Sequence, residues 1–567
     1  MKKLFYILSA FILAASCSVL DFDESSSQYS RDEMYKTYSN IQKMLTNIYG
    51  YLPNKDIADV SSALRDCGSD DAEYADPDAS VQRFTNGNWT AIQTVDDKWS
   101  LYYGIRSANE FLSHWQPDGN GGLRATFDLS MYQYESKYSK WWEHLNLYPY
   151  EAKVLRAYFF FELARRYGDI AMPLTMLSAE EANSIEKTSF DDVIEFIVKE
   201  CDESAAFLPN TYVGMLDDEI GRVTKGFALG VKTKALLYAA SPLHNPTGDK
   251  AKWKRAAEAA KEIIDLNYYM LDPAEKANNY LSREVIMAIE RSESQSFEAY
   301  NFPVRFTEGT RTFMAGTFPS QQLVDAFQTI GGYDITLGAN GWQTADPAFD
   351  VTKPYEGRDP RFARAILANG MTFKGSAIET FVGGKDYSAT RSELGTVTGY
   401  YLRRYIQEST SFTPENTVTN KHQWIVYRYA EALLSYAEAL NEYMDSPAAK
   451  DETFTLSAEE AINQVRANAG MPDVDAASKA AFRDAVRREW RVEFAFEDHR
   501  FWDIRRWNIG QNVMGQLDGV EIVKEGGNLS YSRKTVESRI WSEKMNLYPI
   551  PQAETFNNPN LVQNTGW

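Results

Sequence analysis

The side chains best suited to bind a ligand are aromatic rings that stand beside amides and charged groups in two loop-like stretches. One stretch runs from 66 to 89 and the other from 300 to 342. Tyr and Trp rings offer a flat apolar face with a polar tip, and their polar neighbours can hydrogen-bond to hydroxyl groups. This combination suits a neutral, amphipathic sugar. The candidate ligand-binding residues are Asp71, Tyr74, Asn88, Trp89, Tyr300, Phe302, Arg305 and Trp342.

Packing inside the protein is the alternative role for these residues. Trp89 and Trp342 each follow a pair of Gly and Asn residues, which is typical of an exposed turn. Arg305 would favour an acidic sugar, although a structural ion pair is the commoner role of such a side chain. Both interpretations stay open for each residue at this point.

A segment dense in opposite charges, RREWRVEFAFEDHRFWDIRRW (487–507), allows a catalytic interpretation. Glycosidases use paired carboxylates, so Glu493, Glu497 or Asp503 could act as an acid or a base. Arg side chains are interleaved with these carboxylates along the segment. Because interleaved opposite charges usually pair with each other, we predict a structural ion network here and no catalytic residue. The same interleaving argues against nucleic-acid binding.

Composition excludes several further classes of protein. The chain of 567 residues carries 79 acidic and 59 basic residues, and its net charge of −20 disfavours nucleic acid as a partner. Its five His are scattered, and it has no CxxC, no HExxH and no glycine-rich phosphate loop. We therefore predict no cofactor, although the acidic run from 66 to 78 could hold a structural calcium ion. Cys67 and Cys201 are expected to be free buried thiols, with a disulfide between them as the alternative.

The first residues, MKKLFYILSAFILAASC, have the features of a secretory signal. Two Lys precede an apolar run that is too short for a membrane span, which needs about 20 residues. The small residues before Cys17 resemble a bacterial lipobox. This predicts a lipoprotein signal peptide at 1–16, lipidation of Cys17 and a lipidated tether at 17–35. An ordinary signal peptide cleaved near Ala15 or Ser16 is the alternative.

Helical periodicity dominates the rest of the chain, and the predicted helices come in pairs. The pairs are 151–167 with 190–208, 224–240 with 253–266, and 427–443 with 458–469. Their lengths and small residues resemble tetratricopeptide hairpins, with generic antiparallel hairpins as the alternative. Between about 275 and 415, Gly, Thr and aromatic residues replace this period, which predicts loops and short strands.

The predicted fold is therefore mainly α, with tetratricopeptide-like helical hairpins supporting a less regular, loop-rich, ligand-binding part with short strands. An N-terminal helical repeat part is predicted at 36–274, with ligand loops at 66–98. A loop-rich, ligand-facing insertion follows at 275–420. A C-terminal helical repeat pair and a closing segment complete the chain at 421–567.

Several segments, in their order along the chain, resemble the SusD/RagB family of outer-membrane nutrient-binding lipoproteins of Bacteroidetes. The resemblance covers nearly the whole chain and begins with the lipobox. The segments that carry it are WSLYYGIRSANEFL (99–112), EAKVLRAYFFFELARRYGDIAMPL (151–174), GRVTKGFALGVKTKALLYAASPL (221–243), FPSQQLVDAFQTIGG (318–332), YEGRDPRF (355–362), RYAEALLSYAEALNE (428–442), AINQVRANAG (461–470), the charged segment 487–507 and LYPIPQAETFNNPNLVQNTGW (547–567).

The resemblance implies a non-catalytic protein of the cell surface. Such a protein would capture an oligosaccharide or polysaccharide and deliver it to a SusC-like TonB-dependent transporter, while its N-terminal lipid holds it on the outer membrane. Family members contact ligands through loops before the 99–112 segment and around VDAF (324–327), where the two aromatic stretches lie. A secreted glycoside hydrolase on a helical scaffold and a repeat scaffold that binds only protein are the alternative functions.

Overall fold

The computed structural model describes residues 31–52, 60, 62–214, 219–273, 281–310, 316–390, 394–476 and 478–567. Cys17 and the predicted signal peptide lie outside the described residues. Within these ranges, no helix combines the length and the apolar character that crossing a bilayer requires. Cys67 and Cys201 are both buried and free, as the sequence predicts.

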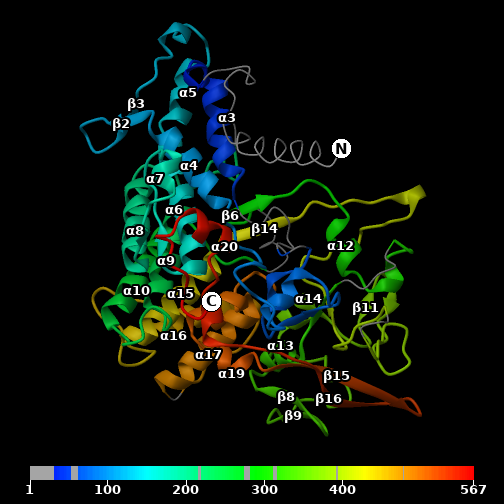
Figure 1. The fold of residues 1–567 in the computed structure, drawn as a ribbon. Helices are drawn as coiled ribbons and strands as arrows, with labels where there is room; N and C mark the ends of the chain where they lie inside the picture. The colour runs from blue at the N-terminus through cyan, green and yellow to red at the C-terminus, as the bar shows by residue number, and fades with distance from the viewer. Residues whose placement is uncertain are drawn as a thin grey trace, which may run out of the picture.

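A row of paired helices forms one half of the molecule (Figure 1) and confirms the prediction of a mainly α fold. The row consists of α6 (Tyr148–Tyr167), α8 (Phe190–Ala205), α9 (Lys225–Ala240), α10 (Lys250–Asp265), α15 (Tyr429–Tyr443) and α16 (Ala458–Ala469). Each helix packs on the next, and α10 packs on α15 although the whole insertion separates them in sequence. The C-terminal pair therefore continues the row that the N-terminal pairs begin.

Local sequence explains where these helices begin and how closely they pack. Thr224 and Asp249 cap α9 and α10, because each side chain accepts a hydrogen bond from a backbone N–H of the first turn. In α9, Gly230 faces the ring of Tyr427, and a Cβ atom there would lie only 2.9 Å from the ring. A larger residue at 230 would push the strand that carries Tyr427 away from the helix.

Three further helices stand together at one end of the molecule (Figure 1): α3 (Tyr38–Tyr49), α4 (Leu101–Leu112) and α5 (Tyr138–Leu145). α4 packs on α6, and α3 packs on both. Trp99 precedes α4, where its ring packs against Tyr102 and Tyr167. A long α17 (Lys479–Glu493) packs on α15 at the other end of the chain.

The insertion contains short antiparallel strand pairs, as predicted, and also short helices, which were not predicted. β6 (Val285–Glu290) pairs with β14 (Gln423–Arg428), and β8 (Ile335–Gly338) pairs with β9 (Gly341–Thr344). β7 (Thr317–Pro319) pairs with β1 (Ala72–Tyr74) of the N-terminal part. The helices here are α12 (Ser296–Asn301), α13 (Gln321–Ala326) and α14 (Pro360–Ala365).

The closing segment holds a long β-hairpin that is absent from the predicted elements. β15 (Gln516–Glu525) and β16 (Asn528–Ser538) are joined by Gly526 and Gly527, which both have positive φ. Other short elements are α2 (Arg31–Met34), α7 (Ala179–Ala182), α18 (Arg500–Arg506), α19 (Gly510–Val513), α20 (Gln552–Asn557), β2 (Trp115–Pro117), β3 (Leu123–Ala125), β4 (Ile170–Ala171), β5 (Lys187–Thr188), β10 (Ile366–Leu367), β11 (Thr372–Phe373), β12 (Ser376–Ala377) and β13 (Tyr401–Leu402).

Two groups of apolar side chains hold these parts together. The larger core runs through the helical row and into the insertion. A separate small core lies within the loop-rich part and joins β7 to the residue that follows β1. We call it the second core; its members are Ala75, Phe302, Phe318, Leu367, Phe373, Ile378, Val397 and Tyr401.

Candidate functional site

The two aromatic stretches, about 230 residues apart in sequence, meet in the structure at the pair of β1 and β7. Glu73 lies opposite Phe318 in this pair. Beyond the strand end, Ser320 donates hydrogen bonds from its N–H to the carbonyl oxygen of Asp71 (2.8 Å) and from its hydroxyl to that of Asp70 (2.6 Å). The strand pairing and these two hydrogen bonds hold the two stretches against each other.

Buried ion pairs fix the base of the first stretch. Asp70 accepts two hydrogen bonds from Arg500, at 2.7 and 2.8 Å, and Asp71 accepts one from Arg491 at 2.7 Å. Burial alone would raise the pKa of Asp70, but the guanidinium groups of Arg491 and Arg500 lower it to about 2. The prediction that Asp71 contacts ligand is wrong for this structure, because its carboxylate is fully buried against Arg491.

Three of the predicted aromatic contacts also belong to the interior. Trp89 is 2% exposed, and its ring packs edge-on against Phe84, Tyr548 and Trp567. Tyr74 is buried in β1, and Phe302 lies inside the second core. The structure corrects the prediction for all three, since a sugar cannot stack on a ring that is buried inside the protein.

Trp342 lies in β9, on the hairpin that β8 begins, and is nearly buried. Its ring packs edge-on against Tyr355, and the guanidinium of Arg358 lies 5.4 Å from the ring centre. This contact, rather than an exposed turn, explains why a large aromatic residue follows Asn340 and Gly341. The expectation of an exposed stacking ring at 342 is therefore corrected as well.

Tyr300, Arg305 and Asn88 are the predicted residues that reach the surface. Tyr300 is half-buried, near the end of α12. Arg305 lies over the ring of Phe306, 4.3 Å from its centre, and donates a hydrogen bond from Nε to Asp386 Oδ1 at 2.8 Å. Phe306 itself packs against the second core. Asn88 is exposed in the turn that follows Asn86.

We call the surface around Tyr300, Arg305 and Phe306 the second-core face. It combines a half-buried tyrosine with a guanidinium that lies over an aromatic ring. Ala75, the residue that follows β1, belongs to the same core. Tyr300 and Arg305 are among the predicted ligand residues, whereas Asp386, which accepts a hydrogen bond from Arg305, is not.

The carboxylates of the charged segment are engaged in ion pairs, as the structural interpretation predicts. Glu493 receives hydrogen bonds from Arg361 (2.8 Å) and Arg428 (2.7 Å), and these two cations, acting against burial, lower its pKa to about 2. Asp503 pairs with Arg506 at 2.7 Å, although burial raises the pKa of Asp503 to about 6. Within the described ranges, no group of three or more His, Cys, Asp or Glu side chains is placed to hold a metal ion.

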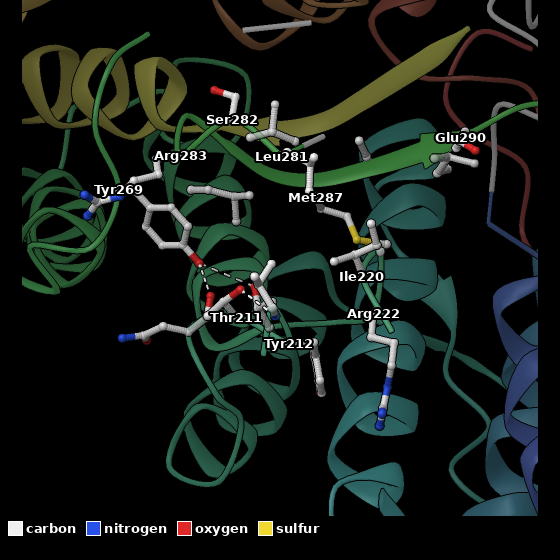
Figure 2. A pocket seen from close by; sticks show the side chains of 18 of the residues that line it. Thr211, Tyr212, Ile220, Arg222, Tyr269, Leu281, Ser282, Arg283, Met287 and Glu290 are labelled. Atoms are coloured by element: carbon white, nitrogen blue, oxygen red, sulfur yellow. Dashed lines mark hydrogen bonds between the residues drawn. The ribbon is translucent and has the colours of Figure 1, made fainter. Parts of the chain in front are cut away.

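A cavity of about 400 Å³ lies elsewhere, beneath β6 (Figure 2). Met287 points from β6 toward Ile220 across the cavity, whereas Arg222 points away from β6. Aliphatic residues of β6 form one wall, and tyrosines of the helical part form much of the other. The residues that define it include Tyr49, Leu52, Thr211, Tyr212, Ile220, Tyr268, Tyr269, Leu281, Val285, Ile286, Met287 and Ile289.

Most polar groups of this cavity are already bound within the protein. The Tyr212 hydroxyl donates to the carbonyl oxygen of Val223 at 3.1 Å, and the Tyr269 hydroxyl donates to that of Asn210 at 3.3 Å. Arg222 pairs with Glu219 at 2.9 Å and with Glu151. The cavity is large enough for a ligand but offers a sugar few free hydrogen-bonding partners. Its residues come from five separate stretches of the chain, so no local pattern could have revealed it.

The structure combines a helical-repeat scaffold with a loop-rich half that carries an aromatic and charged face. Residues 283–567 match the family model described as the SusD family, and the chain belongs to this family. A SusD-like protein P25 of Formosa agariphila is 22% identical over 99% of this chain and 96% of its own length.

Solved structures agree with this fold. A SusD-like protein from Bacteroides fragilis, 24% identical, superposes with a TM-score of 0.73 over 95% of this chain and 99% of its own. A second structure from Bacteroides fragilis is described as a SusD-like carbohydrate binding protein. It is 25% identical, with a TM-score of 0.70 over 93% of this chain and 100% of its own.

Proposed function

We propose that this protein is a non-catalytic glycan-binding lipoprotein of the outer-membrane surface. It captures an oligosaccharide and delivers it to a SusC-like TonB-dependent transporter, and the lipid on Cys17 anchors it. Family membership supports this function, together with the carbohydrate binding ascribed to the 25%-identical relative. The observation that carries the proposal is the meeting of the two aromatic stretches at β1 and β7.

The second-core face is the proposed ligand site. Arg305 presents a guanidinium held over Phe306, and Tyr300 adds a second ring with a polar tip, so the face can both stack on a sugar and hydrogen-bond to it. The cavity beneath β6 is less suited, because its tyrosine hydroxyls at 212 and 269 are bound internally. No step of this function needs an acid or a base, so affinity should depend little on pH.

Substitution of Tyr300 and of Arg305 tests the site. Tyr300→Ala and Arg305→Ala should each weaken binding of the recognised oligosaccharide on the order of tenfold, since each removes about 1.4 kcal/mol or more of contact. Titration calorimetry on the folded variants measures this. Tyr300→Ala leaves the Arg305–Asp386 pair intact, so it separates loss of contact from loss of that ion pair.

Thr211→Ala, in the wall of the cavity beneath β6, is the matched control and should leave the affinity unchanged. The reverse pattern, a loss with Thr211→Ala and none with Tyr300→Ala or Arg305→Ala, would move the ligand site from the second-core face to the cavity.

A further inference from the structure

An unusually exposed group of aromatic residues stands at the end of the helical half, in residues 130–142 (SMYQYESKYSKWW). We call it the aromatic tip. Tyr134 is 92% exposed, the highest value for any large apolar side chain among the described residues, and Met131 is 74% exposed. The other bulky side chains of the tip are half-buried: Tyr132, Tyr138, Trp141 and Trp142. Exposed apolar groups gathered in this way usually mark a contact surface.

The aromatic tip lies beside the start of the described chain. The ring of Tyr38, at the first residue of α3, stacks on Trp141 with centres 5.2 Å apart and planes 3° from parallel. Figure 1 shows α3, α5, β2 and β3 at the same end of the molecule. The chain therefore leaves the described structure at the end that carries the aromatic tip.

The length of chain before this point limits how far the tip can be from the anchor. Cys17 precedes Arg31, the first described residue, by 14 positions. A segment of that length spans at most about 50 Å, even when fully extended. With a lipid on Cys17, the bilayer surface is within reach of the end that carries Tyr134 and Met131.

The chemistry of the aromatic tip fits a membrane surface. Tyr and Trp rings are enriched where lipid headgroups meet the hydrocarbon, because they combine an apolar body with a polar tip. Lys137 and Lys140 stand among the rings, and Glu135 and Glu143 offset their charge. Contact would therefore depend on burial of rings rather than on attraction to anionic lipid, which the net charge of −20 opposes.

We propose that the aromatic tip is a membrane-contact surface that lies in the headgroup region of the bilayer to which the chain is anchored. This inference rests on the proposed lipid anchor at Cys17. It fixes an orientation: the helical end around α5 faces the lipid, while the hairpin of β15 and β16, at the opposite end in Figure 1, faces away.

Spin-label accessibility tests the orientation in the lipidated full-length chain, reconstituted in vesicles of phosphatidylethanolamine and phosphatidylglycerol. A nitroxide is attached at Glu135→Cys in the tip, or at Glu525→Cys in the exposed hairpin as the matched control. Cys67 and Cys201 are buried and should not react. The label at 135 should collide more with oxygen and less with a water-soluble nickel chelate than the label at 525. Equal accessibility at both sites would overturn the proposal.

A second variant and a flotation assay separate the other outcomes. Met131→Ser with Tyr134→Ser changes two exposed side chains, so the fold should persist, and the accessibility of the label at 135 should shift toward the values seen at 525.

A label at 135 that is shielded from both reagents would indicate contact with protein and contradict the proposal. A chain that does not float with vesicles would overturn the lipid anchor and this inference with it. A chain that floats with equally accessible labels would overturn the inference alone.

Discussion

Replacing Arg428 by alanine should lower the free energy of unfolding by about 3–5 kcal/mol, because it leaves several buried carboxylates without their shared cation. The Arg428 side chain is 4% exposed and donates to Glu284 (2.6 Å), Glu493 (2.7 Å) and Glu497 (2.9 Å). These partners come from the start of the insertion and from the C-terminal charged segment. Urea unfolding of the variant and the parent chain measures the loss.

Arg255→Ala is the matched control for Arg428→Ala. Arg255 pairs with Glu195 at 2.5 Å between α10 and α8, but both side chains are about half exposed. Exposed pairs contribute about 0–1 kcal/mol, so this variant should unfold almost as the parent does. If the two variants lost the same stability, the charged segment would not be the structural network described here.

Trp89→Ala should cost about 3–5 kcal/mol of stability, the range for removing a large aromatic side chain from a packed core. The Trp89 ring joins the first aromatic stretch to Tyr548 and Trp567 of the C-terminal segment, with ring centres 4.7 and 4.9 Å away. Its loss would therefore loosen the contact between segments far apart in sequence. Thermal and urea unfolding measure the effect.

Two further variants show whether Trp89 supports the fold or contacts the ligand. Ile92→Ala, three residues away and 74% exposed, should change stability by no more than about 0.5 kcal/mol. Trp89→Phe keeps much of the packing and should retain the affinity for oligosaccharide. A large loss of affinity in folded Trp89→Phe would show that Trp89 contacts the ligand and would contradict its structural role.

The helical scaffold could be predicted from sequence because each helix carries its own signal. The repeat of apolar residues, the caps at Thr224 and Asp249 and the small residues of α9 all act locally. The hairpin of β15 and β16 also has a local signal, in the alternation around Val520 and Ile522 and in the paired glycines 526 and 527.

The ligand residues could be predicted only in part, because exposure depends on partners far away in sequence. Trp89 and Trp342 stand in turn-like sequences, yet Tyr548 covers one ring and Tyr355 the other. Asp71 looks like a free carboxylate until Arg491, 420 positions later, is placed beside it. The pairing of β1 with β7 brings the two aromatic stretches together, and no local pattern in either stretch predicts it.

Titration of the lipid-free mature chain with a panel of neutral and acidic oligosaccharides, followed by analysis of the recovered sugars, tests the central claim most directly. The account predicts saturable binding of at least one oligosaccharide, which is recovered at its original length. Shortened products would contradict the non-catalytic role, and the absence of binding across the whole panel would contradict glycan capture itself.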